Sequence, residues 1–149
     1  MDKGKGLLLR SAVLYYAKCL KLKARIDDTL PIGFPLQAFF PQLPAAIEAG
    51  SPGTGGQSPL RKEALKNILC LKHGIALVRI LGPGEKAFGD GACRYIQMGD
   101  WTEGTMEEAV SRAFELIGRE TDVDFARDRN AIKEMARSLS DDETSDTDP

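Results

Sequence analysis

The sequence predicts an α+β fold, with about four or five helices packed around a small antiparallel β-hairpin. Several segments place apolar residues at helical spacing, whereas only two short apolar runs have the composition of strands. Hydrophobic residues make up 42% and charged residues 28% of the 149 residues, which is ordinary for a folded domain. We therefore expect one domain over 1–139, followed by a tail over 140–149.

The first predicted helix spans 7–26, which contains neither Gly nor Pro and is rich in Leu, Ala and Lys. At about 100° per residue, one narrow stripe collects Arg10, Lys18, Lys21 and Arg25. Apolar side chains cover most of the remaining circumference. An apolar face this wide needs covering by the domain's own core or by a second chain.

The next segment, 27–49, contains four prolines, which exclude a long helix. It is too apolar for a free linker, so we expect a packed irregular segment that ends in a short helix at 44–49. Residues 50–58 are rich in Gly and Ser but match neither a Walker-type loop nor a dinucleotide-binding loop. They predict a flexible joint.

A second helix is predicted over 59–72, with Gly74 just after its end. Its basic residues Arg61, Lys62 and Lys66 are expected on the outside. The apolar face that we expect to be buried consists of Leu60, Ala64, Leu65, Ile68, Leu69 and Leu71.

Two strands follow, at 75–81 and 92–98, separated by a turn-rich loop of about ten residues. The first is apolar on both faces apart from Arg79, as expected in the middle of a sheet, and the second carries Arg94 and Gln97. A two-stranded hairpin is marginal by itself. Either helices cover one of its faces, or a second copy pairs with its edge. The second solution, together with the wide apolar face of the first helix, predicts a homodimer.

Two further helices complete the domain. Thr105 and Glu108 have the spacing of a capping box, and apolar residues continue at helical spacing as far as Gly118. A narrower apolar stripe predicts the last helix at about 123–139. The last ten residues, 140–149, contain no hydrophobic side chain and predict a disordered acidic tail.

The cysteines predict the compartment. Cys19, Cys70 and Cys93 are odd in number and far apart, which argues against a disulfide framework and for a reducing environment. The N-terminal apolar run is interrupted by Arg10 and does not resemble a signal peptide. No run approaches the roughly 18 apolar residues of a membrane span. We therefore expect an intracellular, cytoplasmic protein.

The charges are distributed unevenly along the chain. Residues 1–100 contain 14 Lys and Arg against 8 Asp and Glu, whereas residues 101–149 contain 6 against 14. This asymmetry predicts electrostatic recognition, within the molecule or with a partner. The acidic tail either competes for the protein's own basic stripe or only improves solubility. The candidate residues for binding a partner or nucleic acid are Arg10, Lys18, Lys21, Arg25, Arg61, Lys62, Lys66, Arg79 and Arg94.

Candidate catalytic and metal-binding groups are incomplete. Cys70 and His73 have the spacing of two zinc ligands or of a nucleophile and its base, but the remaining ligands or catalytic groups are missing. Asp90, Asp100 and Glu103 flank the second strand, as the carboxylates of a metal-dependent nuclease do. The lysine that usually follows such acids is absent. We therefore predict no enzyme activity, no metal and no cofactor.

The predicted function is that of a small, self-associating interaction protein that binds a protein partner through helix and sheet-edge surfaces. The alternative is a nucleic-acid-binding module that uses the basic stripe of the first helix together with Arg79 and Arg94. An interfacial membrane helix is a third reading of 7–26, but that segment contains no Trp or Phe, and we expect no membrane binding.

Overall fold

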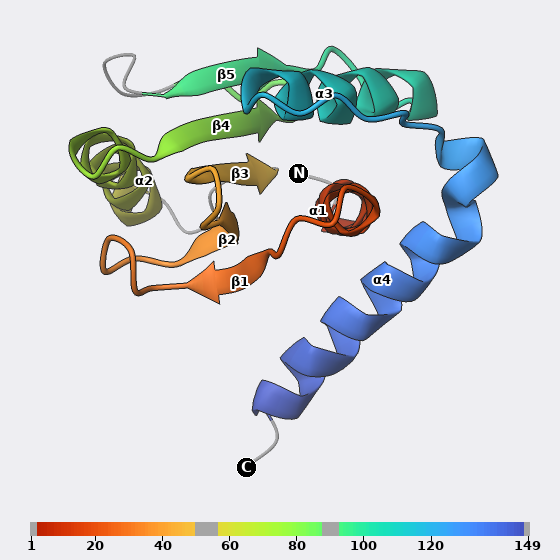
Figure 1. Ribbon diagram of the computed structural model, residues 1–149, viewed down its shortest axis with the longest axis horizontal. Helices are drawn as coiled ribbons and strands as arrows, with labels where there is room; N and C mark the ends of the chain where they lie inside the picture. The colour runs from red at the N-terminus through yellow and green to blue at the C-terminus, as the bar shows by residue number, and fades with distance from the viewer. Residues whose placement is uncertain (1–2, 50–56, 88–92, 148–149) are drawn as a thin grey trace.

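The structure, a computed structural model, describes residues 3–49, 57–87 and 93–147. The helices and strands within these ranges are shown in Figure 1. They are α1 (Lys3–Cys19), β1 (Arg25–Asp28), β2 (Leu36–Phe40), β3 (Ala45–Ala49), α2 (Gln57–Lys72), β4 (Ala76–Leu81), β5 (Arg94–Gln97), α3 (Glu103–Leu116) and α4 (Phe125–Thr147).

The described strands form one mixed sheet in sequence order, β1-β2-β3-β4-β5. β1, β2 and β3 pair antiparallel, whereas β3, β4 and β5 run parallel. The α+β class holds, but the prediction of a small antiparallel hairpin is wrong. The two strands predicted to form it are β4 and β5, which pair in parallel with Ile80 opposite Ile96. The connection over 82–93 is long enough for a parallel crossover, so its length did not distinguish the two arrangements.

The segment 27–49 is not irregular. It contains the end of β1 and all of β2 and β3, and the short helix predicted at 44–49 is β3 instead. Its four prolines lie in the two connections between these strands. The strands have only four or five residues each, too few for an alternating pattern to be recognised. Because the sheet has five strands, it does not need a second copy to complete it.

The first helix ends at Cys19 and does not continue to 26. The Leu22 N–H donates to the carbonyl of Ala17 at 2.9 Å, and Lys21 has a φ of 61°, which together form a helix C-terminal turn. Beyond the turn, Ile26 pairs with Ala38 as part of β1. Sheet pairing therefore overrides the helical pattern of this segment.

The other helices lie where they were predicted, but the ends of the last two differ: Thr105 is not the N-cap of α3, and α4 extends beyond the predicted end at 139. The last two begin at Glu103 and Phe125, and the N-cap of α3 is Thr102, whose hydroxyl accepts a hydrogen bond from the Thr105 N–H. The backbone of α4 is helical to Thr147. Residues 50–56, and the side chains of 140–147, lie outside the described part, so the flexible joint and the disordered tail stay predictions.

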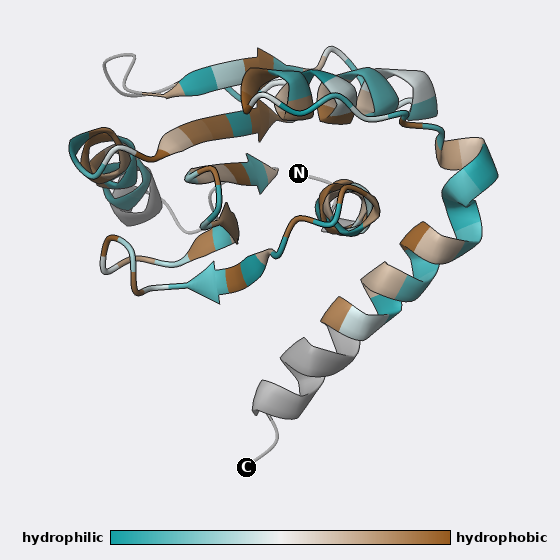
Figure 2. Cartoon of the chain, in the orientation of Figure 1, coloured by the Kyte–Doolittle hydropathy of each residue, from teal (hydrophilic) through white to brown (hydrophobic). Residues whose placement is uncertain are grey.

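Helices cover both faces of the sheet (Figure 1). α1 and α3 pack on one face against β3 and β4, and α4 packs on α1. This side holds the larger core, in which the rings of Phe40 and Phe114 lie 6.3 Å apart. α2 covers the other face over a smaller core that includes Leu36, Cys70 and Leu77. β4 contributes to both cores and is hydrophobic along most of its length (Figure 2).

Within the described ranges, no helix combines the length and the apolar composition needed to cross a membrane. The three cysteines are free: Cys19 is exposed, Cys70 is buried and Cys93 is partly buried.

Candidate functional site

The orientation of α2 is the most unusual feature of the fold. The helix turns charged and polar side chains toward the sheet: Glu63, Lys66 and Asn67 are buried. Its large apolar side chains Leu65, Ile68 and Leu71 are instead 42%, 48% and 65% exposed. The predicted orientation is therefore wrong: much of the expected buried face is outside, and Lys66 is inside.

The physical reason lies in the sheet beneath α2. Gln37, Glu48, Arg79 and Tyr95 come from four neighbouring strands and occupy adjacent register positions in one row. The Gln37 N–H donates to the Glu48 carboxylate at 2.7 Å, which ties β2 to β3. A row containing a buried acid and a buried base needs polar partners above it, because unpaired charges are very unfavourable away from water. The polar face of α2 supplies them.

Two acids and two bases form the centre of this network. Lys66 Nζ donates to the Glu48 carboxylate and lies 3.3 Å from Glu63 Oε1. Arg79 Nη1 donates to the same Glu63 oxygen at 2.9 Å, and Arg79 Nη2 donates to the Glu63 carbonyl at 3.1 Å. The formal charges cancel. We define Glu48, Glu63, Lys66 and Arg79 as the buried ion-pair network.

Asn67 extends this network to the edge strand. Its Oδ1 accepts from Arg79 Nε at 2.8 Å, and its Nδ2 donates to the Tyr95 hydroxyl at 3.0 Å. None of the network's described side chains has a buried nitrogen or oxygen without a hydrogen-bond partner. A closed, neutral and satisfied network of this kind anchors a helix to a sheet and specifies its register.

The thiol of Cys70, which lies beside the buried ion-pair network, is not activated as a nucleophile. Burial, and then the Glu48 carboxylate, raise the pKa of Cys70 to about 11, so the thiol is protonated at neutral pH. His73 follows the end of α2 and is exposed, whereas the Cys70 side chain faces the sheet. A nucleophilic cysteine requires the opposite, a lowered pKa with a base in contact.

The predicted carboxylate group is used for local structure. Asp90 lies outside the described residues. Asp100 accepts hydrogen bonds from the Thr102 hydroxyl at 2.7 Å and the Thr102 N–H at 3.0 Å, and these bonds lower its pKa. Glu103 accepts from Arg129 at 3.0 Å. Over the described ranges, no group of three or more His, Cys, Asp or Glu side chains is placed to hold a metal ion.

The nine candidate basic residues do not form one surface. Lys66 and Arg79 are in the buried ion-pair network. Arg10 pairs with Asp27 at 2.8 Å, and Arg25 lies 3.6 Å from Asp28. The others are exposed in three separate places: at the end of α1, on α2 and on the edge strand β5. They are Lys18, Lys21, Arg61, Lys62 and Arg94.

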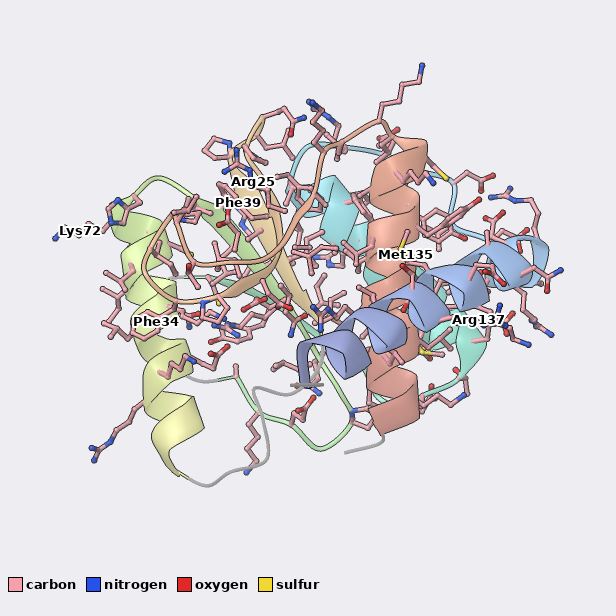
Figure 3. The ribbon with its side chains drawn as sticks, turned by 90° about the horizontal axis from the view of Figure 1, so that it is seen from below. Arg25, Phe34, Phe39, Lys72, Met135 and Arg137 are labelled. Atoms are coloured by element: carbon pink, nitrogen blue, oxygen red, sulfur yellow. The ribbon has the colours of Figure 1, made fainter. Side chains whose placement is uncertain are left out.

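The outward side of α2 combines apolar and basic side chains. At 100° per residue, Arg61 and Lys72 fall on the same side of the helix as Leu65, Ile68 and Leu71. Lys72 projects away from the body of the molecule (Figure 3). We define these five residues as the α2 outer face. Lys62 flanks it, with its ammonium 5.7 Å from the ring centre of Phe34.

A hollow with a volume of about 370 Å³ lies between β5 and α3. Tyr95 and Gln97 line it from the edge strand, and Glu108 and Arg112 line it from the helix. Because Glu108 and Arg112 have opposite charges, the α3 side of this hollow favours neither an acidic nor a basic partner.

Sequence reasoning missed Glu48, Glu63 and Asn67. One signal was available: Glu48 and Arg79 each interrupt a short apolar run, "AAIEA" and "ALVRIL". A charged residue inside a buried apolar run needs a partner of opposite charge, so each of these residues indicates a buried ion pair. The sequence does not reveal that Glu48 and Arg79 lie side by side on neighbouring strands.

No protein-family model matches the chain, and no curated protein or solved structure shows significant similarity to it.

Proposed function

We propose that the protein is a non-catalytic interaction protein that binds an acidic protein partner through the α2 outer face. The observation that carries this proposal is the inverted orientation of α2. The helix buries its ion pairs and leaves Leu65, Ile68 and Leu71 about half exposed to water. Clustered apolar side chains on a surface are characteristic of interaction sites.

The apolar residues supply the affinity. Full burial of a Leu or Ile side chain contributes about 1.5–3 kcal/mol. The three side chains recur at i, i+3 and i+6, so a partner helix or strand lying along α2 can cover all of them. The buried ion-pair network holds α2 in place, so this face is preorganised for binding.

The charges define the partner. The α2 outer face carries Arg61 and Lys72, and Lys62 lies beside it. The acidic residue of α2, Glu63, is buried beneath the helix. A complementary surface is therefore apolar with acidic residues around it.

The basic residues of the α2 outer face disfavour self-association through this helix. Pairing of α2 with α2 of a second copy brings basic residues together in either orientation, which is unfavourable. The homodimer stays a prediction, and it requires a surface other than the α2 outer face. The free cysteines support the proposal of an intracellular location.

Nucleic-acid binding has weaker support. Two of the nine candidate cations are buried in ion pairs, and two more are partly neutralised by Asp27 and Asp28. The α2 outer face is also apolar along its centre, where phosphates find no partner.

The test uses a fluorescent amphipathic peptide helix with leucines on one face and glutamates around them. We expect it to bind the full chain, and Ile68→Gln/Leu71→Gln to weaken binding by about tenfold or more. Gln keeps the helix propensity of α2. The matched control is Ile68→Leu/Leu71→Met, which changes the same two positions but keeps them apolar and favourable for a helix.

Three results contradict the proposal: equal binding by the glutamine double variant and the wild type, an equal loss in the apolar control variant, or equal binding of a peptide in which lysine replaces every glutamate. A thymidine oligonucleotide that binds more tightly than the acidic peptide favours the nucleic-acid alternative.

A further inference from the structure

We propose that a groove at the C-terminal end of α1 is a second binding site, which takes an acidic peptide segment with one apolar side chain. The groove has a volume of about 350 Å³ and lies between the end of α1, the turn that follows it, β1 and α4. It uses no residue of the α2 outer face.

The floor of the groove is apolar. Leu14 is buried, Leu22 and Met135 are partly buried, and Ile26 is 45% exposed. Met135 lies where α4 crosses α1 (Figure 3). The floor thus combines residues from both helices and an edge strand, and it has room for an apolar side chain of a ligand.

The rim is cationic. Lys18, Lys21 and Lys23 line the groove and are exposed. Their ammonium groups form no salt bridge with the described residues, whereas the nearby Arg10 and Arg25 each have an aspartate partner. The local positive charge of the rim is therefore available to a ligand, and that ligand is acidic.

The turn after α1 positions these lysines. The Lys21 N–H donates to the Lys18 carbonyl at 3.0 Å, and the Leu22 N–H donates to Ala17 at 2.9 Å. Lys21 has a φ of 61°, a left-handed conformation that turns the chain sharply. Both carbonyls at the helix end are thus occupied within the protein, and the lysine side chains provide the charge that a ligand meets.

The chemistry of the floor favours a peptide over a nucleic acid or a membrane. Nucleic-acid bases stack on aromatic side chains, and no residue lining this groove is aromatic. A membrane surface binds protruding apolar residues, whereas Leu14 lies recessed below the lysines. Acidic side chains on either side of one apolar residue match both the rim and the floor.

The test measures binding of a labelled peptide of Asp and Glu with one central leucine to the full chain. We expect Lys18→Gln/Lys23→Gln to weaken binding by about fivefold or more, and rising salt to weaken it further. Lys86→Gln/Lys133→Gln removes the same charge from exposed lysines outside the groove and is the matched control. We expect that control to bind as the wild type does.

A second peptide, with serine in place of the central leucine, tests the contribution of the apolar floor of the groove. We expect this peptide to bind more weakly than the leucine peptide. Equal affinity for both peptides, or an equal loss in both lysine variants, overturns the proposal. Tighter groove-dependent binding of a thymidine oligonucleotide or of phosphatidylserine vesicles also overturns it. The Ile68→Gln/Leu71→Gln variant keeps this site, so failure here and failure of the α2 outer face are distinguishable.

Discussion

At the scale of single residues, two polar contacts connect elements that are far apart in the sequence. The buried ion-pair network joins α2 to β3 and β4. On the other side of the sheet, the Tyr16 hydroxyl of α1 donates to Asp128 Oδ2 of α4 at 2.7 Å and accepts from the Asp124 N–H at 3.0 Å. Each contact involves a buried or partly buried group, so each should affect stability more than an exposed pair does.

We predict that Lys66→Met destabilises the protein by about 3–5 kcal/mol, because it leaves Glu48 buried without its cation. The measurement is the free energy of unfolding in urea. The double variant Glu48→Gln/Lys66→Met should be more stable than Lys66→Met, since it removes the unpaired charge. Arg137→Ala, which breaks an exposed pair with Glu134, should change stability by less than about 1 kcal/mol. A Lys66→Met variant as stable as Arg137→Ala contradicts the prediction.

The environment of Asp128 should make the stability of the protein depend on pH. The Arg127 guanidinium and the Tyr16 hydroxyl lower the pKa of Asp128 in the folded state below its ordinary value of 3.8. Its contribution is therefore present above that value and is lost as the pH falls through the folded pKa. Asp128→Asn should lower the melting temperature at neutral pH, and the difference from wild type should shrink as the pH falls below 3.8.

The control for this experiment is Asp122→Asn. Asp122 also pairs with Arg127, at 2.7 Å, but its side chain is 83% exposed. We expect this variant to melt close to the wild type. A loss that is equal in the two variants, or one that does not change with pH, is inconsistent with the role given to Asp128.

At the scale of elements, α2 shows that an amphipathic pattern does not determine which face a helix buries. Its leucines and isoleucine recur at helical spacing, and burial of that face was the natural expectation. The sheet, however, presents Glu48 and Arg79 at adjacent positions. Placing apolar side chains over two buried charges is less favourable than placing Glu63, Lys66 and Asn67 there.

This orientation predicts an unusual response to substitution. Ile68→Gln/Leu71→Gln should change the free energy of unfolding by less than about 1 kcal/mol, because Ile68 is already 48% exposed and Leu71 65% exposed. Leu77→Ala, under α2 in the smaller core, should cost about 2–5 kcal/mol. Thermal or urea unfolding of both variants measures the difference. Strong destabilisation by the glutamine pair would show that α2 buries its apolar face.

At the scale of the whole molecule, α1 and α3 cover one face of a mixed sheet, α2 covers the other, and α4 forms an outer layer on α1. The two proposed binding surfaces therefore lie on different layers. One is on the outside of α2, and the other is where α1, α4 and β1 meet. The two proposals together therefore predict that two acidic segments bind independently.

The sequence by itself determined the features that depend on local periodicity. The amphipathic pattern predicted α3 and α4, and the apolar runs predicted β4 and β5 as strands. These predictions succeed because spacing along the chain carries the information.

Only the tertiary structure decided how these elements pair. Whether β4 and β5 are parallel depends on the path of their connection, and β1 to β3 are too short to be recognised from spacing. The meeting of Glu48 with Lys66 and of Arg79 with Glu63 brings together residues from three elements. Local sequence does not encode these long-range contacts, and they alone turned the apolar side of α2 toward water.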